Sequence, residues 1–195
     1  GGPWMTPLRL AVSAVSGLLL VGGASSLAQA PLPSHGHAAT PSAGGATAGG
    51  ITWTVPGAWT EGQGSAMRVA TYEVPGAKGA EPGQCAVFYF GPGQGGGVDA
   101  NVQRWAGQFK EKPTPKQARR TVAGVPVTRV DVAGTYLNPG GGMMQSQGEK
   151  PGYRLLGAIV EAPEGNVFFK LTGPAATVGA AEAAFEGLVG SIGRK

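Results

Sequence analysis

The sequence predicts an α+β domain, in which a mostly antiparallel sheet of six to seven strands packs against two helices. Three observations support this class. From residue 51 onward, apolar residues mostly alternate with polar ones or form short runs, as strands do; most runs are joined by short turns containing Gly or Pro; and only two stretches have a helical period. Strands joined by short turns pair antiparallel, because a parallel pair needs a long crossover connection.

The first half of the domain is predicted to contain three strands followed by a helix. The predicted strands are residues 51–55, 67–74 and 84–90. Because 84–90 is apolar at nearly every position, we expect a central strand that is covered on both faces. Apolar residues then recur at helical spacing from Val98 to Phe109, which predicts a helix over 98–110.

The second half is predicted to contain four strands, a mobile glycine-rich loop over 138–152 and a final helix. The predicted strands are residues 118–122, 126–136, 153–162 and 167–172. In the second of these, the apolar positions change parity after Val127, which indicates either a bulge near Arg129 or burial on both faces. The final helix is expected to begin at Pro174, and its apolar stripe continues to Ile192.

The amino-terminal part has the pattern of a cleavable export signal. After Met5, the expected natural start, Arg9 precedes an apolar run and then small residues. The run is shorter than the ~20 residues of a membrane-spanning helix, so cleavage after Ala28 is expected to leave no stable membrane span. The predicted segments are a signal peptide over 1–28, a disordered Pro/Gly/Ala/Ser linker over 29–50, and one domain over 51–195. The expected location is periplasmic or secreted.

The composition disfavours several functions. The formal charge is only +4, and the one dense basic group, around Lys110–Arg120, is typical of a solvated loop rather than a nucleic-acid surface. The single cysteine, Cys85, lies in an apolar run and is expected to be a small buried side chain. Both histidines, His35 and His37, lie in the predicted linker, so no histidine-based catalytic group is expected in the domain. We therefore expect no enzyme, cofactor or metal site.

One motif suggests a binding site. The segment 91–96 satisfies G-x-G-x-x-G between a predicted strand and a predicted helix. A dinucleotide site needs an acidic residue on a following strand ~20 positions on, and the nearest one in a predicted strand, Asp131, lies much too far along the chain. Backbone N–H groups at the start of the helix could hold an anion instead, because the helix dipole favours negative charge there. The alternative is that the glycines only permit a tight turn. The candidate ligand-binding residues are Gly93, Gln94, Gly95, Gly96, Gly97 and Arg104.

The order of motifs resembles the PsbP-like α/β sandwich domains. One motif is W-x-x-P-x-x-W over 53–59, and another is the closing run GNVFFKLTGP over 165–174, which enters a helix ending near Ser191-Ile192. The block over 88–105 is similar to a group of uncharacterised exported bacterial proteins. The resemblance covers about residues 51–192 and implies this fold and mostly non-catalytic roles, but it assigns no site residue.

The expected function is that of an exported, non-enzymatic accessory or binding protein, acting in the cell envelope or outside the cell. Its partner would be a protein or another envelope component, and its oligomeric state is left open. One alternative is a small-ligand or anion binder that uses the loop 91–97. A third is an enzyme, which would require Arg129, Asp131 and Glu161 to converge on one pocket.

Overall fold

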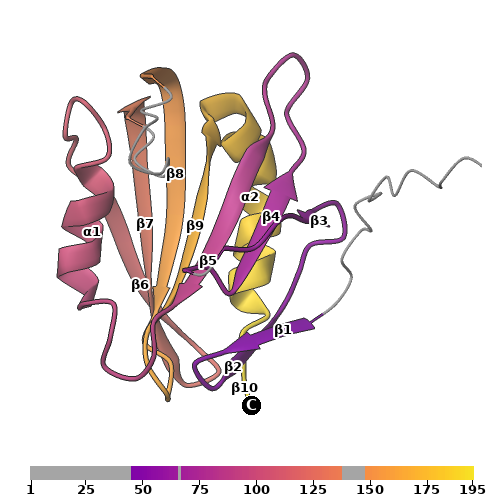
Figure 1. Ribbon diagram of the computed structural model, residues 1–195, viewed down its shortest axis with the longest axis vertical. Helices are drawn as coiled ribbons and strands as arrows, with labels where there is room; N and C mark the ends of the chain where they lie inside the picture. The colour runs from indigo at the N-terminus through magenta and orange to yellow at the C-terminus, as the bar shows by residue number, and fades with distance from the viewer. Residues whose placement is uncertain (1–44, 66, 138–147) are drawn as a thin grey trace, which may run out of the picture. The chain divides into compact units, whose positions relative to one another are not determined.

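Seven antiparallel strands form the main sheet of the computed structural model, which describes residues 45–65, 67–137 and 148–195 (Figure 1). All of these residues belong to one unit of the chain, His37–Lys195. In order across the sheet, the strands are β3 (Thr60–Glu61), β4 (Ala70–Val74), β5 (Gly83–Tyr89), β9 (Val167–Pro174), β8 (Lys150–Val160), β7 (Val125–Tyr136) and β6 (Lys116–Val122). The predicted α+β class with a mostly antiparallel sheet is therefore confirmed.

A second, smaller sheet contains β1 (Gly45–Ala48), β2 (Ile51–Thr54) and β10 (Gly193–Arg194), with β2 in the middle. Gly49 and Gly50 join the first two strands and both have positive φ angles, of 59° and 81°, which a two-residue hairpin turn requires. The residues of β1 were expected to be linker, so the ordered domain begins earlier than Ile51. The predicted signal peptide and the rest of the predicted linker lie outside the described residues.

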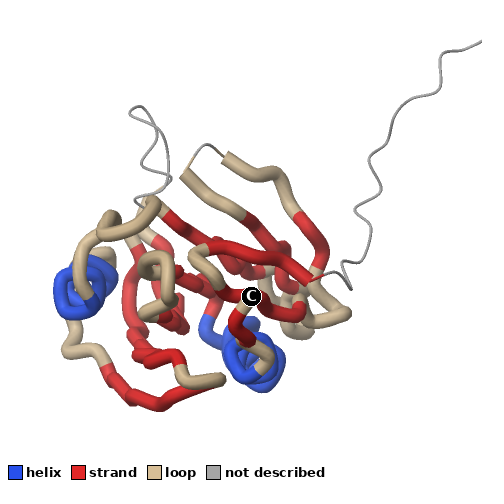
Figure 2. Tube along the Cα trace, turned by 90° about the horizontal axis from the view of Figure 1, so that it is seen from below, coloured by secondary structure: helices blue, strands red, loops and turns tan. Residues whose placement is uncertain are grey.

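Two helices, α1 (Val98–Ala106) and α2 (Ala175–Gly190), pack on opposite faces of the main sheet (Figures 1 and 2). On one face, Val127 of β7 belongs to the same apolar cluster as Phe185 of α2. On the other face, Val130 belongs to the same cluster as Trp105 of α1. Since successive side chains of a strand point to opposite faces, these two clusters place the helices on opposite sides.

Burial on both faces explains the change of parity in β7. Its register with β8 runs without interruption from Val127 to Gly134, and the irregularity lies between Gly134 and Tyr136. The predicted bulge near Arg129 is therefore wrong, and the alternative, burial on both faces, is confirmed. The odd-numbered residues of this segment face α2, and the even-numbered ones face α1.

The first helix is shorter than predicted. It ends at Ala106, with Gly107 as its C-cap, and the chain then turns so that Phe109 bridges to Tyr136. Phe109 continues the helical spacing in the sequence, but it is buried through this turn. At about 1.5 Å per residue, a nine-residue helix is short relative to a seven-stranded sheet. Its contacts with the sheet are mainly to β7, and this leaves part of the same face uncovered.

The second helix lies where the sequence predicts it, although it begins at Ala175, one residue after Pro174, and ends at Gly190, before Ile192. Its predicted stripe is buried at every position: Val178, Ala181, Phe185, Leu188, Val189 and Ile192. Pro174 is the residue just before its first turn, at the N-cap. The loop predicted over 138–152 lies largely outside the described residues. Within the described ranges, neither helix has the length and apolar character needed to cross a membrane.

Candidate functional site

Among the described residues, neither helix lies over β4, β5 and the end of β9 near Thr172 on the face of the sheet that carries α1, and we call this surface the open face. Gln84 of β5 pairs with Glu73 of β4 and with Thr172 of β9, and none of the three side chains is buried. Phe88 of β5 and Lys170 of β9 belong to the same face and are half-buried. The expectation that 84–90 is covered on both faces therefore holds on this side only at Ala86, which is buried, and is wrong at Gln84 and Phe88, which are partly exposed.

A close contact at Gly157 fixes where the open face begins. Gly157 of β8 pairs with Lys170, and Trp105 of α1 lies directly over it. A Cβ atom at this position would collide with the indole ring, so glycine is required for α1 to approach β8. The helix thus ends its contact with the sheet next to Lys170.

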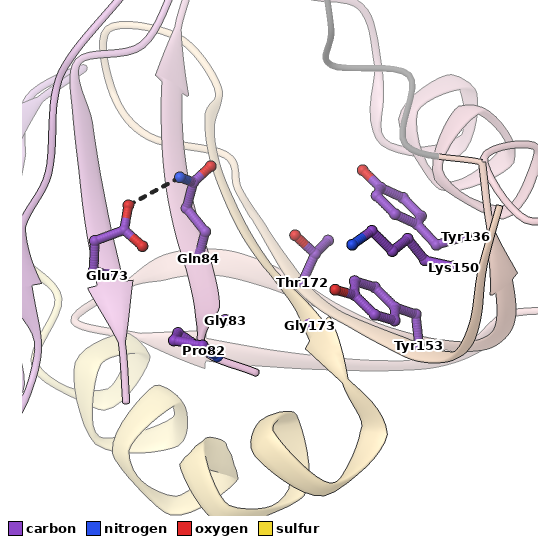
Figure 3. Close-up of a pocket in the computed structure, with 9 residues that line it drawn as sticks. All are labelled: Glu73, Pro82, Gly83, Gln84, Tyr136, Lys150, Tyr153, Thr172 and Gly173. Atoms are coloured by element: carbon purple, nitrogen blue, oxygen red, sulfur yellow. Dashed lines mark hydrogen bonds between the residues drawn. The ribbon is translucent and has the colours of Figure 1, made fainter. Parts of the chain in front are cut away.

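At one end of the open face lies a hollow of about 250 Å³, which we call the open-face hollow (Figure 3). In Figure 3, Tyr136, Lys150 and Tyr153 extend from one side toward Thr172, and Glu73 and Gln84 lie on the other. The residues that line it are Glu73, Pro82, Gly83, Gln84, Tyr136, Lys150, Tyr153, Thr172 and Gly173.

The aromatic side of this hollow is held by several contacts. The rings of Tyr136 and Tyr153 are stacked, with centroids 5.9 Å apart and planes 6° from parallel. The Lys150 ammonium lies 5.9 Å from the Tyr153 ring centroid and 3.6 Å from a Glu81 carboxylate oxygen. The Tyr153 hydroxyl donates to the same carboxylate at 3.2 Å. The charge of Lys150 is therefore balanced within the protein.

Lys170 has a different environment. Its ammonium donates a hydrogen bond to the Tyr136 hydroxyl at 3.3 Å and lies 5.7 Å from the centroid of that ring. Burial, and to a lesser extent the charge of Arg68, lowers the pKa of Lys170 to about 8. Burial also raises the pKa of Tyr136 to about 12, so this hydroxyl keeps its proton at neutral pH.

Arg68, two residues before β4, is the second cation of the open face. Its guanidinium donates to the Gln84 amide oxygen at 2.7 Å and lies 5.6 Å from the Phe88 ring centroid. The Gln84 amide nitrogen in turn donates to Glu73 at 3.1 Å. Gln84 thus stands between Arg68 and the carboxylate of Glu73.

Neither Arg68 nor Lys170 forms an ion pair with any Asp or Glu side chain of the chain. All eleven Asp and Glu residues are among the described residues, and none of their ion pairs involves either cation. Partly buried cations are usually paired, because removal of a charge from water is costly. Two half-buried like charges that form no ion pair favour an added anion.

The glycine-rich loop lies elsewhere and is held by its own contacts. The Asn101 side-chain amide donates to the carbonyls of Gly95 and Gly97, each at 2.9 Å, and Arg104 donates to the Asn101 side-chain oxygen at 3.0 Å. Gly95 has a φ of 86°, and a Cβ there would lie 2.9 Å from the Phe168 ring. These contacts account for a tight turn.

Of the predicted loop residues, Gly97 lines a second hollow at the start of α1, with a volume of about 370 Å³. Gly93 and Gln94 form a turn in which the Gln94 N–H donates to Gly91, and Gly96 accepts a bond from Asn166. Arg119 in the second hollow is paired with Glu161 at 3.0 Å, and Asp99 adds another carboxylate. Anion binding by this loop stays a prediction.

The three residues considered for an enzyme do not share a pocket. Arg129 and Asp131 lie under α2, where Arg129 is paired with Glu182 and Glu186. Asp131 accepts two hydrogen bonds from Arg154, at 3.0 and 2.8 Å, and these lower the pKa of its carboxyl group. Glu161 is paired with Arg119 instead. Arg129 and Asp131 therefore belong to an ion-pair network that attaches α2 to the sheet.

The lone cysteine behaves as its sequence context predicts. Cys85 is fully buried on the α2 face, and burial raises the pKa of its thiol to about 12, which confirms a packing role. Over residues 45–65, 67–137 and 148–195, no three His, Cys, Asp or Glu side chains gather as metal ligands would.

Sequence reasoning missed Arg68, Lys170 and the two tyrosines of the open-face hollow. One signal was present, since Lys170 is the only charged residue in the apolar run 167–171. A charge in such a strand needs either a partner or access to solvent.

Comparisons with known proteins add little to these observations. No family model matches the chain, and no curated protein is similar enough to match. Among solved structures, the chain is similar to a protein of unknown function, PA94 of Pseudomonas aeruginosa. The identity is 16%, the match covers 72% of this chain and 88% of that one, and the TM-score is 0.41. A structural similarity of this degree gives no information about function.

Proposed function

We propose that this protein is an exported, non-enzymatic binding domain, and that it binds a small anionic ligand on the open face between Arg68 and Lys170. The observation that carries the proposal is the presence of two half-buried cations without an ion-pair partner. All eleven Asp and Glu residues of the chain are described by the structure, and none of them pairs with either cation. A carboxylate or phosphate would accept charge-assisted hydrogen bonds from both. It would also offset their mutual repulsion.

Export is supported by the order of residues in 1–28, a basic residue, an apolar run and small residues. The accessory role is supported by the composition of the open face, where two cations and two tyrosines are suited to hold a ligand. The resemblance to domains with mostly non-catalytic roles points the same way.

The hollow at the start of α1 is a weaker candidate for the same ligand. Its helix N-terminus favours an anion, but the carboxylates of Asp99 and Glu161 line the same space, and Arg119 is already paired. The negative charge already present there would oppose a second anion. The open face has the larger uncompensated positive charge.

NMR titration of the full chain with glycolate and, separately, inorganic phosphate tests the proposal. We expect the amide shifts to be largest around Arg68, Lys170 and Thr172. Lys170→Met should weaken binding by about ten-fold or more, because a hydrogen bond to a charged group contributes about 1.5–3 kcal/mol. Lys110→Met, which removes an exposed lysine paired with Glu149, is the matched control and should bind as wild type does.

Shifts confined to residues 95–100 would instead support the glycine-rich loop and contradict the open-face site. The absence of shifts with both anions would contradict anion binding altogether.

A further inference from the structure

We infer that Lys170 is a carbonyl-reactive amine, which forms a reversible imine with a small aldehyde or ketone that carries a carboxylate. The inference rests on the proposed function, because Arg68 would hold the carboxylate of the same ligand. It adds a covalent step to the proposed anion-binding surface.

The position of Lys170 in the sheet brings its amine beside the open-face hollow. On β9 it lies between Ala86 of β5 and Gly157 of β8, and the ring of Trp105 fills the space over Gly157. The side chain of Lys170 is only partly exposed. Its ammonium reaches Tyr136, a residue that lines the open-face hollow.

The environment of Lys170 favours the neutral, nucleophilic amine. The charged and titratable groups on the elements around it are Arg68, Glu73, Tyr136, Lys150 and Tyr153, and no carboxylate among them is paired with Lys170. With a pKa of about 8, roughly a tenth of the amine is neutral at pH 7. Desolvation and a neighbouring cation are the two means by which lysine nucleophiles are activated in enzymes.

Lys110 provides a contrast within the same chain. Its ammonium is exposed and lies 2.9 Å from a Glu149 carboxylate oxygen, and this contact raises the pKa of Lys110. Almost all of that amine is protonated at neutral pH. The two lysines should therefore differ strongly in reactivity toward a carbonyl compound.

The reaction is balanced without a further reactant. The neutral Lys170 nitrogen attacks the carbonyl carbon, so that a C–N bond forms and the carbonyl oxygen becomes a hydroxyl group. This hydroxyl then leaves, and the two amine protons and the carbonyl oxygen end up as one water molecule. The C=O bond is replaced by a C=N bond, and no group is oxidised or reduced.

Tyr136 is placed to assist the departure of water. Its hydroxyl lies 3.3 Å from the Lys170 amine and keeps its proton, because burial raises the pKa of Tyr136 to about 12. It can donate a hydrogen bond to the oxygen that leaves. Arg68 lies over the neighbouring strand β5, where it is bonded to Gln84, and its guanidinium would hold the carboxylate of the ligand.

The ligand class follows from these positions. The carboxylate and the carbonyl group must lie close together, as they do in a 2-oxo acid. The adjoining hollow of about 250 Å³ is of a size for a small molecule rather than a polymer. Glyoxylate is the smallest probe of this class, and acetaldehyde is its counterpart without a carboxylate.

Reductive trapping tests the inference. The full chain is incubated at pH 7.5 with cyanoborohydride and either glyoxylate or acetaldehyde, and the modified lysines are identified by peptide mass spectrometry. We expect glyoxylate to modify Lys170 at least ten-fold faster than Lys110, and Arg68→Met to remove most of the preference for glyoxylate over acetaldehyde. Modification of Lys170 no faster than that of Lys110 would overturn the inference, and this comparison needs no variant.

Glycolate separates the imine from the binding site on which it depends, because it has the carboxylate but no carbonyl group. Glycolate-induced shifts around Lys170 without a trapped adduct would overturn the imine and leave the proposed function standing. The absence of both the glycolate-induced shifts and the trapped adduct would overturn the imine and the proposed function together.

Discussion

Single residues determine how far the open face extends. Gly157 lets Trp105 lie against β8, and a side chain there would force α1 away from the sheet. Lys170 is the next residue across that row. One glycine therefore defines the boundary between the covered and uncovered parts of this face.

Gly157→Ala should be destabilising. The new methyl group would collide with the indole ring of Trp105, and overpacking of this kind costs about 1–3 kcal/mol. Chemical denaturation would measure the free energy of unfolding.

Gly187→Ala in α2 is the control, because no neighbouring atom lies within 4 Å of the added group. Alanine should raise the free energy of unfolding there by up to about 1 kcal/mol. Equal effects of the two substitutions would contradict the packing of α1.

The candidate site could not be derived from the spacing of its residues. Arg68 and Lys170 are far apart in the chain, and they belong to the same region of the sheet only because β5 pairs with both β4 and β9. The lysine was conspicuous within its apolar strand, but the sequence did not indicate which residues surround it. The glycine-rich motif, by contrast, was conspicuous because its residues are adjacent, and its contacts are those of a turn.

At the scale of elements, periodic patterns were the reliable guide. The long strands and α2 were predicted because apolar residues repeat along them. The strands β1, β3 and β10 were missed because they contain few or no large apolar residues and are defined by the strands with which they pair. The overlong prediction for α1 has a similar origin, since Phe109 fits the helical period but is buried through a turn.

The ion-pair network under α2 makes that element sensitive to acid. The pKa of Asp131 is lowered in the folded state by Arg154, so the folded state binds this proton less readily than the unfolded state. The stabilisation is therefore present above the unfolded pKa of about 3.9 and is lost as the pH falls through the lower folded pKa.

Asp131→Asn should lower the free energy of unfolding by about 1–2 kcal/mol at pH 7, because the pair is bidentate and only partly exposed. The difference from wild type should shrink as the pH is lowered below about 4. Urea denaturation at several pH values would measure it. Glu149→Gln removes an exposed pair and should change stability by less than about 1 kcal/mol. A deficit for Asp131→Asn that is independent of pH would contradict the role of the charge.

At the scale of the whole molecule, the distribution of charge is uneven. The chain has fifteen Lys and Arg residues and eleven Asp and Glu residues. Three acidic residues, Asp131, Glu182 and Glu186, are used under α2 to bind arginines. The opposite face of the sheet keeps two half-buried cations that form no ion pair, although Glu73 lies on the same face, and this asymmetry is the basis of the proposed anion site.

The pKa of Lys170 is the measurement that tests this account most directly. The full chain with isotope-labelled lysine would be titrated by NMR, with and without saturating glycolate, and Lys110 would serve as the internal reference. We expect a pKa of about 8 for free Lys170 and a clear increase when glycolate binds, because an anion stabilises the charged amine. A pKa at the ordinary value for lysine that glycolate leaves unchanged would contradict it.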